Sequence, residues 1–209
     1  MKRLFMALLF GAMTVATTAF AAPITSSADP ALSGGSVIDF ESQALGSFSS
    51  MTIGNVTFST SGGNGAGYIT NNWGGSFNAT GINSVDNTES GFTSIQFTFA
   101  NSVDAFGFNW GASNEDWSLS AYDSSNNLLE TYLMPQTWYS NAGEFYGLNV
   151  GNISYAVLTQ LTYNYGTSDW IIMDNFTYTT TASVPEPATF LLLGSGLLGL
   201  GYFRRKFRG

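Results

Sequence analysis

The stretch Ile95-Gln96-Phe97-Thr98-Phe99 is followed by Phe106-Gly107-Phe108-Asn109-Trp110, and in both the large apolar residues alternate with polar or small ones. Alternation with a period of two is typical of a β-strand that buries one face, because successive side chains point to opposite sides. We therefore predict two strands here, whose phenylalanine and tryptophan rings enter a hydrophobic core.

The rest of the domain repeats this alternation in short segments that Gly and Asn clusters separate. Leu119 and Ala121 precede the polar turn Asp123-Ser124-Ser125-Asn126-Asn127, and residues 128–133 return, which predicts a β-hairpin. Further strands are predicted at residues 36–40, 53–58, 144–150, 156–165 and 170–178. About ten short strands, with no long apolar repeat at helical spacing, predict a single all-β domain, a jelly-roll-like β-sandwich over residues 36–178.

All six Lys and Arg residues lie at the two ends of the chain, and residues 22–203 contain no Lys, Arg, His or Cys. Ion pairs and disulfides within the domain are therefore impossible. Nucleic acid is a poor partner, because phosphate binding needs basic side chains. Without His, Cys or Lys the domain also lacks Ser-His pairs, thiol nucleophiles and Schiff-base lysines, so we expect that it is not an enzyme.

The N-terminal segment has the composition of a secretory signal peptide over residues 1–21. Lys2-Arg3 precede an apolar run, and Ala19-Phe20-Ala21 forms a cleavage site with small residues at Ala19 and Ala21. We expect the Sec translocon and signal peptidase as partners, with an uncleaved anchor as the alternative. Residues 22–35, rich in Ser, Ala, Gly and Pro, predict a flexible N-terminal arm.

The C-terminal segment contains a helix breaker, an apolar run and a basic stop. After a polar tether at residues 179–184 come Pro185-Glu186-Pro187, the apolar residues 188–203 and Arg204-Arg205-Lys206. Residues 188–203 predict a transmembrane helix of ~24 Å, slightly short for a bilayer core of ~30 Å. The basic stop should stay cytoplasmic, which places the acidic domain on the other side of the membrane.

This order of triplet, Gly/Leu-rich helix and basic stop over residues 185–206 resembles the PEP-CTERM sorting signal of Gram-negative bacteria. The resemblance implies recognition by an exosortase, a cut near Pro185, Glu186 and Pro187, and passage through the inner membrane to the cell surface or extracellular matrix. It also implies an association with exopolysaccharide and biofilm formation. The alternative is an anchor that is never cut. The domain is diffusely similar to β-rich domains that precede this signal, to which no firm activity is attached.

Acidic residues near the first and last predicted strands indicate a possible metal site. In a jelly roll these strands often lie side by side, so Asp39, Glu41 and Asp174 could together hold a structural Ca²⁺, which prefers oxygen ligands. Strand parity places Asp174 on the apolar face of Ile172 and Phe176, where an unpaired carboxylate is costly. Hydrogen bonds from backbone amides are the alternative solution.

A glycan hydrolase would need two facing carboxylates, and this is the alternative to a binding protein. The candidate side chains are those of Glu115, Asp116, Glu144 and Asp174. Their spacing marks no two of them as partners, so solvated loop carboxylates are the competing interpretation.

Aromatic residues in predicted loops indicate a glycan-binding surface. Trp117, Trp138 and Tyr139, with Trp73 and Trp110 as further candidates, offer flat rings that can stack on sugars beside Asn and Asp side chains. Core packing of these rings is the alternative. Together the patterns predict an exported surface or matrix protein with a structural or adhesive role.

Overall fold

The computed structural model describes residues 23–63, 65–87, 91–162 and 169–180. Within these ranges the chain forms strands and one short 3-10 helix, which confirms the predicted all-β class. The elements are η1 (Pro30–Leu32), β1 (Ser36–Ile38), β2 (Gly46–Phe48), β3 (Ser50–Ile53), β4 (Val56–Ser61), β5 (Gly67–Thr70), β6 (Ser84–Asp86), β7 (Ser94–Gly111), β8 (Trp117–Tyr122), β9 (Leu128–Met134), β10 (Phe145–Gln160) and β11 (Ile172–Thr179).

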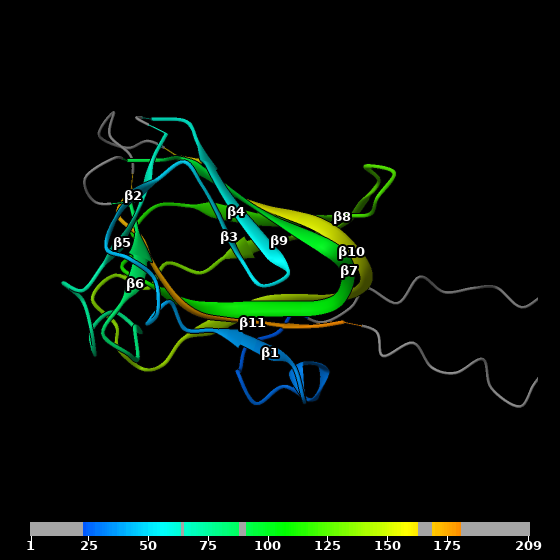
Figure 1. The fold of residues 1–209 in the computed structure, drawn as a ribbon, viewed down its shortest axis with the longest axis horizontal. Coiled ribbons are helices and arrows are strands. Elements are labelled where there is room, and N and C mark those ends of the chain that lie inside the picture. The colour runs from blue at the N-terminus through cyan, green and yellow to red at the C-terminus, as the bar shows by residue number, and fades with distance from the viewer. Residues whose placement is uncertain (1–22, 64, 88–90, 163–168, 181–209) are drawn as a thin grey trace, which may run out of the picture.

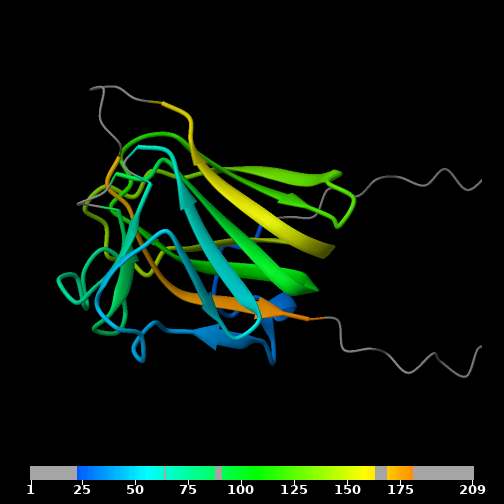
Figure 2. The same ribbon diagram turned by 45° about the horizontal axis from the view of Figure 1, so that its top comes forward.

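Two long strands, β7 and β10, run through both layers of the sandwich and bend between them (Figure 1). Residues 94–99 of β7 pair with β4 and with residues 155–159 of β10. Residues 105–111 of β7 instead pair with β11, and most of them also with residues 145–149 of β10. The first layer therefore contains β3, β4, β8 and β9, the second contains β1, β2, β5, β6 and β11, and each layer holds half of both long strands (Figure 2).

The bend explains why the sequence predicts four strands where the structure has two. At the bend of β10, Gly151 and Asn152 have positive φ angles of 68° and 54°. The register with β7 shifts between Asn149 and Ile153 and again before Tyr155. Such bulges bend a strand without ending it. The polar interruption between the two alternating segments of β7 is therefore a corner inside one continuous strand.

Aromatic rings from the two layers meet in the core. Phe97 of the first layer lies 4.9 Å from Phe176 and 5.6 Å from Phe108, both of the second layer, as measured between ring centroids. Phe108 and Phe176 stack at 5.9 Å with an interplanar angle of 7°. Burying each of these rings stabilises the fold by about 1.5–3 kcal/mol. The alternation of residues 95–99 and 106–110 therefore places its rings in the core, as predicted.

Two predicted pairings are confirmed. The first strand lies beside the last, because β1 pairs with β11 and Ile38 is opposite Phe176. The hairpin of β8 and β9 forms around the predicted turn, where Asp123 Oδ1 accepts hydrogen bonds from the amides of Ser125 and Asn127 at 2.8 and 2.9 Å. This local acceptor stabilises a turn that is otherwise exposed.

The prediction of a flexible arm at residues 22–35 is wrong for the part of it that the structure describes. Ile24 is 1% exposed and exchanges two backbone hydrogen bonds with Gly147, at 2.9 and 3.0 Å. Ile24 and Leu32 pack with Ala105 and Phe145 in a small cluster of their own. Two apolar side chains in a small and polar segment suffice to fix it on the outside of the second layer.

Several predicted segments lie outside the described residues. These are the signal peptide at residues 1–21, residues 181–184 of the tether at residues 179–184, and the sorting signal at residues 185–206 with its helix at residues 188–203. In the part of the chain that the structure describes, no helix is long and apolar enough to cross a membrane.

Candidate functional site

Aromatic rings from three loops gather at one end of the sandwich. Trp73 and Phe77 come from the loop between β5 and β6, Trp138 and Tyr139 from the loop between β9 and β10, and Trp170 from the segment before β11. We call these five residues the aromatic end. The ring of Trp170 lies 4.6 Å from that of Trp73 and 4.7 Å from that of Phe77, and Tyr139 lies 6.3 Å from Phe77.

Hydrogen bonds through Asn78 hold two of these loops together. Its side-chain Nδ2 donates to the carbonyl of Trp110 at 2.8 Å, and its Oδ1 accepts from the amide of Gly143 at 2.8 Å. Its own amide donates to Oδ1 of Asn141 at 2.8 Å. Asn78 also has a positive φ of 66°, a conformation that Asn tolerates better than most residues. The loops are therefore joined to each other and to β7.

The exposure of the rings is graded across the aromatic end. Tyr139 is 83% exposed and Trp138 is 54% exposed, whereas Trp73, Phe77 and Trp170 are half-buried. Trp73 Nε1 donates to Oδ2 of Asp86 at 2.8 Å. The exposed ring of Tyr139 thus lies beside a packed aromatic base, and the exposed Trp138 precedes it in the same loop, which is a suitable arrangement for contact with a flat ligand.

Two buried polar atoms near the aromatic end have no hydrogen-bond partner. They are Nε1 of Trp170 and Oγ1 of Thr137, the residue directly before Trp138. Buried polar groups are normally paired, so each atom leaves a donor that a ligand or water could satisfy.

The prediction that Trp117 binds glycan is wrong. Trp117 is fully buried in the core, and its Nε1 donates to Oδ2 of Asp169 at 2.8 Å. It starts β8, in which Leu119 and Ala121 face the same side, so the period-two pattern itself could have revealed its burial. Trp110 is likewise buried in the core. Phe77 and Trp170 belong to the site but were not predicted from the sequence.

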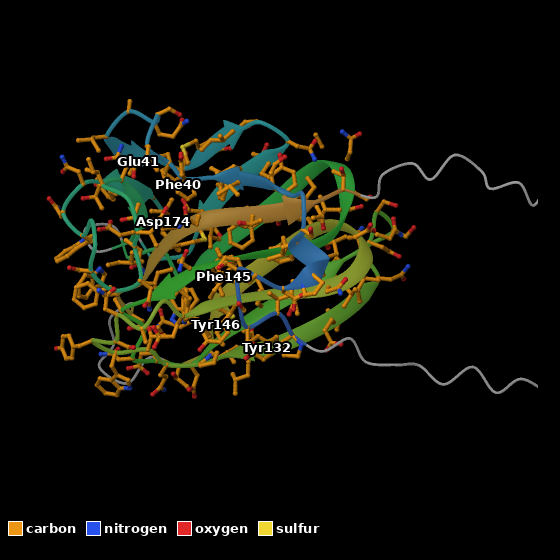
Figure 3. All side chains as sticks on the ribbon, turned by 90° about the horizontal axis from the view of Figure 1, so that it is seen from below. Phe40, Glu41, Tyr132, Phe145, Tyr146 and Asp174 are labelled. Carbon is orange, nitrogen blue, oxygen red and sulfur yellow. The ribbon has the colours of Figure 1, made fainter. Side chains whose placement is uncertain are left out.

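Asp174 and Glu41 both hold the loop between β5 and β6, and Figure 3 shows their side chains near one another. Asp174 Oδ2 accepts from the amides of Thr80 at 2.8 Å and Gly81 at 3.4 Å. Glu41 Oε1 accepts from the amides of Ile82 at 2.6 Å and Asn83 at 3.1 Å. The two acids thus engage four consecutive amides of one loop.

The predicted parity of Asp174 holds for Ile172 but is wrong for Phe176, because a bulge interrupts β11. The register with β7 shifts after Asp174, where Asn175 has a positive φ of 47°. Met173 and Phe176 therefore both face the core, while Asp174 faces the loop. Burial raises the pKa of Asp174, and the hydrogen bonds from Thr80, Asn175 and Gly81 offset part of that rise.

The carboxylates proposed for calcium are occupied by protein donors. Asp39 Oδ1 accepts from the amide of Glu41 at 3.2 Å, in addition to the bonds of Glu41 and Asp174 described above. Within the described ranges no three or more acidic residues come together as a possible metal site. The sequence left open whether a metal ion or backbone amides compensate the Asp174 carboxylate, and the structure shows backbone amides. A calcium site stays a prediction.

The carboxylates considered for hydrolysis also accept hydrogen bonds from neighbouring loops. Glu115 Oε2 accepts from Oγ1 of Thr162 at 2.9 Å, and Asp116 Oδ1 accepts from Nε2 of Gln136 at 3.0 Å. Burial raises the pKa of Glu144, but hydrogen bonds, chiefly from Ser140, outweigh it and leave that pKa lowered. A carboxyl group with a lowered pKa is a poor general acid at neutral pH.

Asp169 is a buried acceptor that sequence reasoning missed. Its carboxylate accepts from Oγ of Ser113 at 3.1 Å and from the amides of Asn114 and Glu115 at 3.2 Å, besides Trp117 Nε1. It therefore fixes the loop between β7 and β8 and lies one residue before Trp170 of the aromatic end. No sequence motif marks it, since its donors are far away along the chain.

Solved structures resemble the chain weakly. A DUF4465 family protein from Bacteroides caccae has 10% identity and a TM-score of 0.37, covering 80% of this chain and 96% of its own. The K3 cleaved adhesin domain of Lys-gingipain from Porphyromonas gingivalis has 15% identity and a TM-score of 0.28, covering 48% and 75%. TmCBM61, solved in complex with β-1,4-galactotriose, has 14% identity and a TM-score of 0.33, covering 68% and 94%. Likeness at this level concerns the fold alone.

The C-terminal segment gives a firmer match. A comparison with curated protein sequences finds none that matches. A family model, the PEP-CTERM protein-sorting motif, matches residues 183–206 and so contains Pro185-Glu186-Pro187 and Arg204-Arg205-Lys206. This motif implies export, processing by an exosortase and sorting to the cell surface. The chain therefore carries a PEP-CTERM sorting motif at residues 183–206, with an all-β domain ahead of it.

Proposed function

We propose that an exosortase cuts this protein near Pro185-Glu186-Pro187 and that the freed sandwich is a structural or adhesive protein of the cell surface or extracellular matrix. The observation that carries the proposal is the sorting motif at residues 183–206. The motif begins a few residues after β11 ends at Thr179. A cut at the triplet would therefore release the sandwich without removing a strand.

The composition of the domain supports a role outside the cell among polymers. Residues 22–203 contain no basic side chain, so the domain is purely acidic. Such a domain is repelled by anionic membrane surfaces once it has been released. A place in an exopolysaccharide matrix or biofilm agrees with this charge. It also agrees with the association with exopolysaccharide that the sorting signal implies.

The test is the mass of the mature polypeptide. We expect the form recovered from the surface or medium to begin at Ala22 and to end near Pro187, in a host that has the exosortase. In a host without the exosortase, the protein should keep Arg204-Arg205-Lys206 and stay with the membrane. Recovery of the same intact C-terminus in both hosts would contradict processing and favour a permanent anchor.

We further propose that the aromatic end contacts a glycan. The supporting observation is the exposure of Trp138 and Tyr139 in a loop whose Tyr139 contacts the half-buried base of Trp73, Phe77 and Trp170. Flat rings provide an apolar face on which a sugar can stack.

Alanine variants test this glycan contact. Trp138→Ala and Tyr139→Ala should each lower affinity by about tenfold or more, the range expected for an interface aromatic. Retention on the producer's own polysaccharide is the measurement. Val37→Ala is the matched control, because Val37 is an exposed apolar residue (58%, against 54% for Trp138) that lies on β1, outside the aromatic end. Equal retention of all three variants would exclude the aromatic end as the site.

A further inference from the structure

The outer face of the first layer is uncharged and rich in hydroxyl residues, and it also includes Gln96, Val157 and Leu133. Six strand segments contribute to it: β3, β4, residues 94–99 of β7, residues 155–159 of β10, β8 and β9. Their inward side chains form the core, and their outward side chains are half-buried or exposed. The outward residues include Thr52, Thr57, Thr98, Thr159, Ser120 and Thr131. We call this surface the hydroxyl face.

Hydrogen bonds across the strands order the hydroxyl groups into rows. Thr52 and Thr57 share one between β3 and β4 at 2.9 Å, and Ser120 and Thr131 share one between β8 and β9 at 2.8 Å. Adjacent strands lie about 4.8 Å apart, so the rows are regular. A hydroxyl group has one donor and two acceptor sites, so each paired hydroxyl keeps free capacity toward solvent.

No acidic side chain occupies an outward position of these six strand segments, although the domain is rich in acids. Their one carboxylate, Glu130, is opposite Ala121, which is a core-facing position of β8. The other acids of the described residues lie elsewhere, mainly in loops at the ends of the strands, as Glu41, Asp116 and Asp123 do. Charge is therefore absent from the outward positions of these strands, although the domain is strongly acidic.

The outer face of the second layer differs, because other parts of the chain cover it. Ile24 and Leu32 of the N-terminal segment pack on Ala105 and Phe145. Ala79 of the loop between β5 and β6 packs with Ile172. The hydroxyl face, by contrast, keeps its outward side chains accessible.

We infer that the hydroxyl face binds a neutral polysaccharide laid flat across the strands, an inference that rests on the proposed role in the matrix. Rows of hydroxyl groups can exchange hydrogen bonds with sugar hydroxyls as both donors and acceptors. An anionic polymer is repelled by the acidic domain, which has no basic side chain to bind it. A second copy of the chain fits less well, because a close sheet-to-sheet contact would remove many hydroxyls from water.

Binding to insoluble neutral polymers tests the inference. The probes are microcrystalline cellulose, insoluble β-1,3-glucan and insoluble mannan, with chitosan as a cationic comparison. The full chain is used in detergent because of its apolar ends. We expect retention on at least one neutral polymer that persists in 1 M NaCl, since no ion pair contributes.

Two sets of variants locate the surface. Thr98→Val with Ser120→Ala removes hydroxyls while keeping shape, and Thr98→Glu with Ser120→Glu adds charge. Both should weaken retention, the second by about tenfold or more. Ser125→Glu with Ser27→Glu makes the same change of charge at exposed positions outside the face and should bind like the unaltered protein. Melting temperatures establish that each variant is folded.

Three outcomes would overturn the inference. These are absence of retention on every neutral polymer, retention only on chitosan with loss in salt, and retention that the face variants leave unchanged. A dimer in light scattering that the Glu variants dissociate would assign the face to a second copy instead. Failure of export or cutting would show in the mass of the mature protein and would leave this binding result unaffected, so the two failures are distinguishable.

Discussion

Asp174 and Glu41 fix the loop between β5 and β6 from two distant points in the sequence. Each presents one carboxylate oxygen to two successive backbone amides. A Cβ atom at Gly81 would lie 1.8 Å from Oε1 of Glu41, so the loop approaches this carboxylate as closely as glycine allows. The same loop supplies Trp73 and Phe77, which links these two acids to the geometry of the aromatic end.

Replacing Asp174 should destabilise the protein. Asp174→Ala leaves the amides of Thr80 and Asn175 without their acceptor, and such a loss costs about 1–3 kcal/mol. Asp39→Ala is the matched control, since it removes the same charge and only one local hydrogen bond, so its effect should stay within about 0.5 kcal/mol. Urea unfolding measures both. An equal loss of unfolding free energy for the two variants would contradict the role of Asp174 in holding the loop. It would point instead to a site that Asp39 and Asp174 share.

The pKa shifts of Asp174 and Glu144 should act on stability in opposite directions. Burial raises the pKa of Asp174 in the folded state, so its contribution to stability falls as pH rises from its ordinary value of 3.8 through the raised pKa. Hydrogen bonds lower the pKa of Glu144, so its contribution is present above its ordinary value of 4.5 and is lost as pH falls through the lowered pKa. Carboxyl-detected NMR titration should show both directions. An Asp174 pKa below 3.8 would mean that its hydrogen bonds outweigh its burial and would contradict the expected direction.

At the scale of the elements, the period-two pattern predicts faces better than it predicts ends. It correctly places Phe97, Phe108 and the β8–β9 hairpin, because alternation depends only on which side of a strand is buried. It cannot tell a bend from an end, so β7 and β10 each appear as two strands in the sequence. It also fails between Asp174 and Phe176, where the bulge at Asn175 puts the two side chains on opposite faces.

The candidate site was less predictable than the fold. Trp138 and Tyr139 could be placed in a loop from the sequence, and the structure finds both exposed. Their neighbours Phe77 and Trp170 come from segments far away in the chain, so no local pattern joins them. Ring contacts across loops depend on topology, which spacing along the sequence does not encode.

The N-terminal segment should contribute measurably to stability through Ile24. Ile24→Ala removes buried methyl groups from the cluster with Leu32 and Phe145, which should cost about 2 kcal/mol. For a domain of this size the melting temperature should fall by about 4–8 °C. Ser27→Ala, at an exposed position of the same segment, is the control. An unchanged melting temperature for Ile24→Ala would contradict this packing and would support the flexible arm that the composition predicts.

At the scale of the whole molecule, the absence of basic residues makes every charge interaction within the domain repulsive. Residues 22–203 hold only carboxylates as charged side chains, so no ion pair can compensate them. The structure places many of these carboxylates on backbone amides, as with Asp169 and Asp174, which satisfies them one at a time. Their mutual repulsion remains and depends on ionic strength.

Added salt should therefore raise the melting temperature, and calcium should act no differently from magnesium. NaCl from 10 to 150 mM shortens the screening length to about 8 Å and weakens repulsion among the carboxylates. Asp174 and Glu41 already accept amide hydrogen bonds, so CaCl₂ and MgCl₂ at equal concentration should give equal melting temperatures. A saturable excess with CaCl₂ that a chelator reverses, reaching about 2.7 kcal/mol at a hundred times the dissociation constant, would instead establish the calcium site. Asp39→Ala should abolish that excess if the site is the predicted one, because the hydrogen bonds of Asp174 and Glu41 to the loop would survive the substitution.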